Sequence, residues 1–196
     1  MRTLRTLVPL TALTLLGACA TGLPRDVVDL ARETKPGGSF FVEFDADGTV
    51  LGADAEVAVE RLPPALVAAA NAEFPGGEVI GAEKEWFDGR RVWEVVKRID
   101  GRTWEIPVGD AGQILGGEET LAESAWPAGI RETALSAAGG GTVNAVERVW
   151  GPEAHAGESY HVKIERDGDS LRVGVAEDGR VVRVVRRISG QVRVPR

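Results

Sequence analysis

The chain has few of the residues on which most enzyme and metal chemistry depends. Its 196 residues include one cysteine, two histidines, one tyrosine and one methionine. A single cysteine forms no internal disulfide, and two histidines are too few for a histidine-rich metal site. The sequence also lacks a phosphate-binding loop, a dinucleotide fingerprint and a Gly-x-Ser-x-Gly elbow. We therefore expect no enzyme activity, no cofactor and no metal.

The longest apolar stretch near the N-terminus is too short for a permanent membrane span. Arg2 and Arg5 precede this stretch, residues 7–16, in a pattern typical of a secretory signal. Residues 16–19, Leu-Gly-Ala-Cys, resemble a bacterial lipobox, and the alternative is an ordinary secreted protein with a chance cysteine. We predict a signal peptide over residues 1–18 and lipid on Cys19. The lipid would hold the chain at the cell envelope, on the periplasmic face of the outer membrane in a Gram-negative cell.

Basic residues are the minority, and most of the surface is expected to be acidic. The formal net charge is −7, which disfavours a nucleic-acid partner. Segment 180–196 is the exception, because it contains six arginines and no acid. We interpret residues 181–188 as a strand whose Arg183, Arg186 and Arg187 form a basic edge. Such arginines either protect an edge strand from pairing or contact anionic lipid or an acidic partner.

The main regularity of the chain is an internal repeat. Shifted by 64 positions, residues 62–86 align with residues 126–150, and the match continues at a shift of 67 after a short insertion. An abbreviated copy precedes these two, and it keeps one helix and the final strand. We therefore divide the mature chain into four parts. These are an anchor region with the abbreviated repeat (19–61), a first module (62–117), an acidic linker (118–125) and a second module with the basic C-terminal strand (126–196).

Each full module is predicted to be a helix followed by an antiparallel meander. Residues 64–74 are good helix formers between a proline and a Pro-Gly-Gly stop. Strands are expected over 79–87, 91–99 and 103–108, with Asp-Gly turns between them. Trp93 and Trp104 share the parity expected to pack beneath the helix, whereas Glu94 and Glu105 fall on the face that should meet water or a partner. The predicted fold class is α+β, with tandem helix-plus-meander modules.

Three segments resemble a known family. The Leu-Pro helix start at 62–63, the strand Val-Trp-Glu-Val at 92–95 and the Asp-Ala-Asp-Gly segment at 45–48 look like parts of PepSY and PepSY-like modules of bacterial envelope proteins. These modules resemble halves of the β-lactamase inhibitor protein fold, which implies a continuous curved sheet with helices on one face.

The resemblance also implies a non-catalytic role, because family members include inhibitory propeptides of secreted metalloproteases. It implies a protein or peptide partner in the envelope, with the chain acting as an inhibitor or regulator of a secreted peptidase or hydrolase. The alternative is an envelope assembly or scaffold lipoprotein without inhibitory activity.

Aromatic residues are the candidates for a partner-binding surface. Trp86 and Trp150 occupy the same repeat position at a strand end, and Phe87 follows the first. Either these residues are binding anchors on a concave sheet face, or each tryptophan closes the end of its own module. Both interpretations stay open at this stage.

Three acidic patterns allow a chemical interpretation, and in each the structural interpretation is preferred. Glu158 and His161, near His155, would form only a weak metal site, and a solvated loop is favoured. Glu83 and Glu85 have the residue type for acid–base catalysis, but on one strand they are interpreted as a solvated face. Acidic segments such as 45–48 and 167–169 are interpreted as turns and not as calcium loops.

Overall fold

The structure, a computed structural model, describes residues 23–87, 89–151 and 157–190. Three short α-helices occur in this part of the chain: α1 (Arg25–Glu33), α2 (Pro64–Glu73) and α3 (Ile130–Ala138). The strands are β1 (Phe40–Phe44), β2 (Val50–Val57), β3 (Glu78–Phe87), β4 (Arg90–Ile99), β5 (Arg102–Val108), β6 (Gly117–Thr120), β7 (Thr142–Trp150), β8 (Tyr160–Arg166), β9 (Asp169–Val175) and β10 (Val181–Ser189). Two 3₁₀ turns, η1 (Val59–Arg61) and η2 (Glu123–Ala125), precede α2 and α3. None of the helices in the described ranges has the length and hydropathy needed to cross a membrane.

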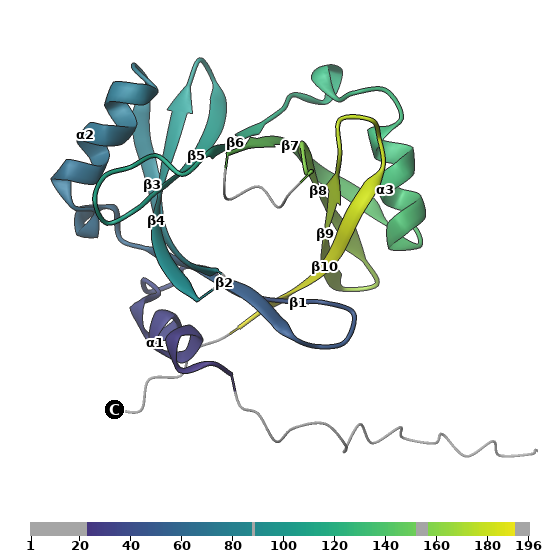
Figure 1. Ribbon diagram of the computed structural model, residues 1–196, viewed down its shortest axis with the longest axis horizontal. Coiled ribbons are helices and arrows are strands. Elements are labelled where there is room, and N and C mark those ends of the chain that lie inside the picture. Colours follow the sequence, from purple (N-terminus) through teal and green to yellow (C-terminus); the bar gives the residue numbers. More distant parts are fainter. Residues whose placement is uncertain (1–22, 88, 152–156, 191–196) are drawn as a thin grey trace, which may run out of the picture.

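The strands form one closed antiparallel barrel. Consecutive strands pair from β1 to β10, and β10 then pairs with β1. The closing pair places Phe41 opposite Ser189 and Phe44 opposite Arg186. Figure 1 shows this seam, where the purple-blue hairpin of β1 and β2 meets the yellow β10. Closure leaves the sheet without an open edge, so the backbone groups of β1 and β10 find partners in each other.

The predicted α+β fold class is therefore wrong. The expected continuous curved sheet closes on itself into a barrel of ten strands, and the described residues add only three short helices outside it. Viewed one module at a time, each meander has a helix-covered face and a free face. Because the closing contact joins residues almost 150 positions apart, no local sequence pattern predicts it. The division of the chain into an anchor region, two modules and a linker stays a prediction.

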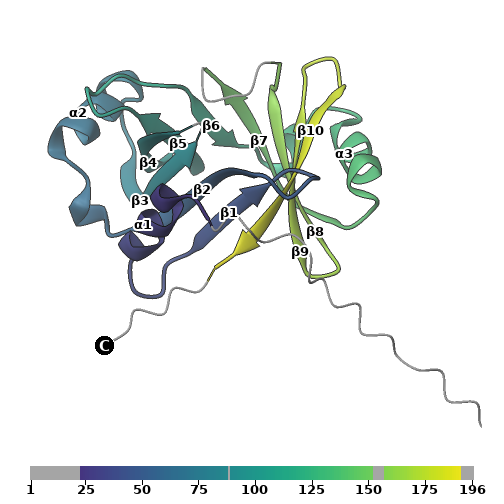
Figure 2. The ribbon, with the colours of Figure 1, turned by 60° about the horizontal axis from the view of Figure 1, so that its bottom comes forward.

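The hydrophobic core lies outside the barrel, in three separate clusters between the helices and the outer face of its wall. Figure 2 shows the three helices on the outside of this wall. Beneath α1, Val27 and Leu30 pack on residues of β1 and β2. Leu66 and Ala70 of α2 pack on the wall formed by β3, β4 and β5. Ile130 and its neighbours on α3 pack on β7, β8 and β9. A barrel whose outer face carries the core must place its other face, the polar one, inside.

Local sequence accounts for the individual elements. Pro64 begins α2, where the fixed φ of proline suits the first helical turn, and the helix ends close to the predicted stop. Asp100 and Gly101 both adopt positive φ in the β4–β5 turn, as an Asp-Gly hairpin requires. The predicted strands after α2 agree with β3, β4 and β5 to within one residue.

Candidate functional site

The lumen of the barrel is lined with charged side chains. Along β4, Val95 packs outward beneath α2, whereas Glu94 points inward and lines a cavity. The same alternation, which follows from the two-residue period of a strand, repeats around the wall. Glu94 and Glu105 therefore lie on the face opposite the core, as predicted, but that face encloses a lumen and does not meet bulk water as a free sheet face would.

Acidic groups outnumber basic groups in this lumen. Within the described part of the chain, nine carboxyl groups face it against four permanent cations and one histidine. The carboxyl groups belong to Glu43, Asp54, Glu83, Glu85, Glu94, Glu105, Glu118, Glu147 and Glu158. The cations are Lys163, Arg172, Arg183 and Arg187, and the histidine is His161.

The cations come from β8, β9 and β10, so one side of the lumen is basic. Arg172 contacts Glu43 at 2.6 Å, and Arg187 contacts Asp54 at 2.8 Å. Both contacts join the last strands of the chain to the first two, across the seam where the barrel closes. Nearby carboxylates raise the pKa of the Arg187 guanidinium above its ordinary value, although burial opposes this. These buried ion pairs hold the seam in register because separating either partner would leave an unpaired buried charge.

His161 on β8 sits between two carboxylates. Its Nε2 hydrogen-bonds to Glu158 Oε2 at 3.0 Å, and its Nδ1 lies 3.0 Å from Glu118 Oε1. Arg183 holds the second oxygen of Glu158, with Nε 2.6 Å from Oε1. Burial opposes ionisation of Glu158, but the hydrogen bond and charge of His161 and the charge of Arg183 bring its pKa down to about 2. Burial disfavours the imidazolium of His161, yet the charge of Glu118 raises its pKa overall.

The preferred interpretation of Glu158 and His161 as part of a solvated loop is therefore wrong. Glu158 is 6% exposed and His161 is 2% exposed, and both side chains lie in the lumen. The chain turns inward here because His161 falls on the inward parity of β8, between Tyr160 and Val162, which pack in the cluster beneath α3. His155 lies outside the described residues.

The opposite side of the lumen, built by β3, β4 and β5, is rich in carboxyl groups and supplies none of the four lumen cations, although Lys163 lies 4.0 Å from Glu105. Burial and the charges of Asp54 and Glu105 raise the pKa of Glu83 to about 8. Burial and the other carboxylates also raise the pKa of Glu85 and Glu94 well above the ordinary range. Like charges confined together disfavour ionisation, so this side holds protons at neutral pH. The interpretation of Glu83 and Glu85 as a solvated face is wrong, because both face the enclosed lumen.

A cavity of about 50 Å³ occupies part of the lumen. It is bordered by acidic side chains including Glu85, Glu94 and Glu118, by His161 and by Arg172. A volume of this size holds on the order of three or four water molecules, or a hydrated ion, but not a drug-sized ligand.

The three predicted aromatic residues all border this cavity, although their rings pack in different clusters. Trp86 packs beneath α1, and its indole N–H is buried without a hydrogen-bond partner among the described residues. Trp150 contacts Trp104 and Phe74, with ring centroids 5.7 and 6.1 Å apart. These contacts show packing at the barrel wall, and a role of Trp86, Phe87 or Trp150 in partner binding stays a prediction.

The three predicted arginines do not form one edge. The strand that carries them, β10, pairs with β9 on one side and β1 on the other, so it is not an edge strand and protects none. Arg183 and Arg187 point into the lumen and pair with acids there. Only Arg186 faces outward, where its side chain is 54% exposed and contacts Asp169.

Sequence reasoning missed the residues that complete this site, namely Glu118, Glu147, Lys163 and Arg172. One signal was present in the chain. The inward positions of β9 and β10 carry Arg172, Arg183 and Arg187 with the same two-residue alternation that places glutamates on β3 and β4. Two strand groups with complementary charge on their non-core faces favour an arrangement in which those faces meet.

Comparison with known proteins gives a partial family match. The PepSY family, described as peptidase propeptide and YPEB domain, matches residues 65–107, which span α2 to β5. No curated protein sequence matches the chain. Among solved structures, the chain is similar to the crystal structure of a DUF2874 family protein from Bacteroides uniformis ATCC 8492, with a TM-score of 0.49 and 14% sequence identity over 64% of this chain and 89% of that chain. A PepSY segment thus lies within this barrel, and it contributes α2 and the acidic side of the lumen.

Proposed function

We propose that this protein is a non-catalytic binding module of the bacterial cell envelope that inhibits or regulates a secreted peptidase or hydrolase. The observation that carries the proposal is the PepSY match over residues 65–107, because the family description refers to peptidase propeptides. Propeptides of this kind act by contact with an enzyme and need no chemistry of their own. The partner in this proposal is a protein, with no nucleic acid involved.

The proposed contact surface includes the exposed outer face of β10. Arg186 lies there between Val184 and Ile188, which are 37% and 44% exposed. Arginine is among the residues enriched in protein interfaces. Trp86 and Trp150 are poor residues for a first test, because their replacement removes packing beneath the helices as well as any partner contact.

The test uses the chain without its predicted signal peptide, residues 20–196, which keeps every described residue. The purified protein is titrated into assays of secreted metallopeptidases and other secreted hydrolases, and binding is measured in parallel. Arg186→Glu is compared with Arg98→Glu, a matched control whose side chain is also 54% exposed and also pairs with one surface acid. The proposal predicts inhibition of a discrete enzyme that Arg186→Glu weakens and Arg98→Glu leaves unchanged.

Two results would change the proposed contact surface or the proposed function. Inhibition that both variants retain would keep the inhibitor function and move the contact surface away from β10. Recovery of integral envelope proteins, with no effect on any hydrolase, would support the scaffold lipoprotein instead.

The envelope location depends on Cys19, which lies outside the described residues. We propose that lipid on its thiol anchors the barrel to a membrane. Labelling cells with a radioactive fatty acid tests this directly: the wild-type chain is expected to incorporate label and fractionate with membranes. Cys19→Ser is expected to do neither. Label-free wild-type protein in the soluble fraction would contradict the anchor.

A further inference from the structure

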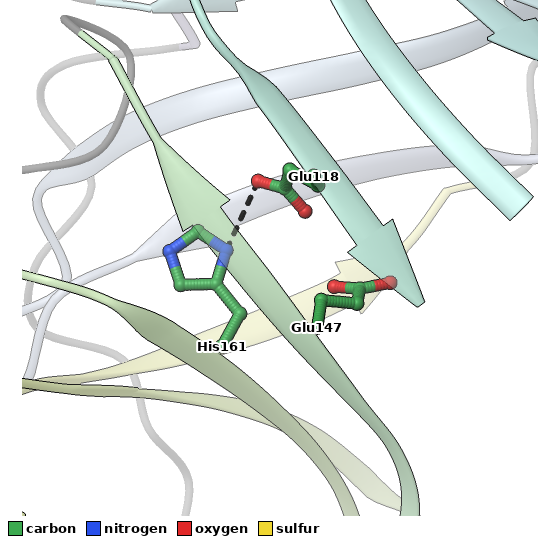
Figure 3. A group of neighbouring side chains, drawn as sticks. All are labelled: Glu118, Glu147 and His161. Carbon is green, nitrogen blue, oxygen red and sulfur yellow. Dashed lines mark ion pairs between the residues drawn. The ribbon is translucent and has the colours of Figure 1, made fainter. Parts of the chain in front are cut away.

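We propose that Glu118, Glu147 and His161 bind one divalent transition-metal cation, of the zinc type, inside the lumen. These residues come from three neighbouring strands, β6, β7 and β8, and their side chains gather on the inner wall (Figure 3). Each residue offers one ligand atom, and the three atoms lie within 4.8 Å of one another. This inference is independent of the proposed peptidase partner.

Two buried atoms of these residues have no hydrogen bond assigned to them, although one of the two is in an ion pair. Glu147 Oε2 and His161 Nδ1 have no hydrogen-bond partner in the described structure, although both residues are only 2% exposed. His161 Nδ1 and Glu118 Oε1 lie 3.0 Å apart as an ion pair. Two ligands of one zinc ion, each about 2.0–2.1 Å from the metal, are separated by roughly 2.9–3.4 Å. The spacing of this pair therefore suits a shared metal ion.

The surrounding residues orient the ligands as metal sites require. When His161 is neutral and its Nε2–H group donates to Glu158, the lone pair lies on Nδ1, which is 3.0 Å from Glu118 Oε1. A ligating histidine usually donates its other ring N–H to a carboxylate in this way. Arg183 fixes that carboxylate, and Lys163 binds Glu147 Oε1 at 2.6 Å, so that Oε2 remains available.

Charge and ligand type favour the same class of cation. Among the described residues, nine carboxyl groups line the lumen against four permanent cations, so a divalent ion would add positive charge where carboxyl groups are in excess. One imidazole with two carboxylates suits zinc and neighbouring divalent transition metals. Calcium and magnesium prefer oxygen ligands alone, and copper(I) prefers sulfur.

The test measures zinc binding to chelator-treated protein, residues 20–196, by calorimetric titration, with cobalt(II) absorption as a second probe of the ligand set. We expect one zinc per chain and a higher melting temperature when zinc is present. His161→Asn and Glu147→Gln are expected to lower the affinity by at least about 100-fold. Glu158→Gln, which only orients His161, is expected to lower it by about 10- to 100-fold.

The control is His155→Ala, which removes the chain's other histidine and is expected to leave zinc affinity unchanged. Circular dichroism establishes that each variant is folded. Absence of saturable zinc binding by the wild-type protein would overturn the proposal and identify His161 as an imidazolium held between two carboxylates. Full zinc binding by folded His161→Asn would also overturn it, because the metal would then sit elsewhere.

Discussion

Glu83→Gln offers the sharpest test of the acidic lumen. Glu83 points from β3 into the barrel, where burial and the carboxylates of Asp54 and Glu105 raise its pKa from an ordinary 4.5 to about 8. Glutamine keeps the size and the hydrogen-bonding capacity of the side chain but carries no charge. The substitution should therefore stabilise the barrel at alkaline pH and change little at acid pH.

Proton linkage gives the sign and the size of the expected change in the free energy of unfolding. Between pH 4.5 and 8, the folded chain holds a proton on Glu83 that the unfolded chain has released, so stability falls as pH rises through this window. Each pKa unit corresponds to about 1.4 kcal/mol, which sets an upper limit of roughly 5 kcal/mol above pH 8. Neighbouring carboxyl groups titrate together with Glu83, so its replacement removes only part of this effect. We expect Glu83→Gln to stabilise the protein by about 2–4 kcal/mol at pH 9 and by less than about 1 kcal/mol at pH 5.

Urea unfolding followed by tryptophan fluorescence at pH 5, 7 and 9 measures these differences. Glu78→Gln is the matched control, because Glu78 lies on the same strand and its side chain is 67% exposed in its pair with Arg98. This substitution should change the free energy of unfolding by no more than about 0.5 kcal/mol at any pH. The wild-type protein itself is expected to lose stability from pH 5 to pH 9. An equal effect of Glu83→Gln at pH 5 and pH 9, or a net destabilisation at pH 9, would refute the acidic lumen described here.

Three further predictions concern packing and are measured by chemical unfolding. Trp150→Ala should cost about 3 kcal/mol, because the ring packs against Phe74 and Trp104, and a loss below 1 kcal/mol would show that these contacts are unimportant. Gly117→Ala should lower the free energy of unfolding by about 1–3 kcal/mol, because the new Cβ would lie 2.6 Å from Cζ2 of Trp150. In a protein that also carries Trp150→Ala, Gly117→Ala should have no such effect. If the loss persists there, the contact with Trp150 is not its cause. Lys97→Met should lower the free energy of unfolding by about 1–3 kcal/mol, because the fully buried ammonium donates a hydrogen bond to the Phe74 carbonyl at 2.6 Å. It should also increase the rate of amide hydrogen exchange at the end of α2. Unchanged exchange would contradict this capping role.

Local sequence patterns were sufficient to locate the elements of this protein. The proline start and glycine stop located α2, the Asp-Gly turns separated β3, β4 and β5, and side-chain parity placed Trp93 and Trp104 with the core and Glu94 on the other face. These features depend on backbone preferences and on the two-residue period of a strand, which a few neighbouring residues determine. The parity of Glu94 did not reveal what its face would meet.

Only the tertiary structure decided where the polar face lies. Pairing of β1 with β10 closes the sheet, and the arginines of β9 and β10 then contact the acids of β1 and β2 across the seam. Pairing of β6 with β7 and of β7 with β8 brings Glu118, Glu147 and His161 together. Closure then buries carboxyl groups that a free sheet would expose to water. Sequence by itself determined that Glu94 and Glu105 face away from the core, because that depends on parity within each strand. The enclosed acidic lumen was decided by a contact between the two ends of the sheet, which no local pattern encodes.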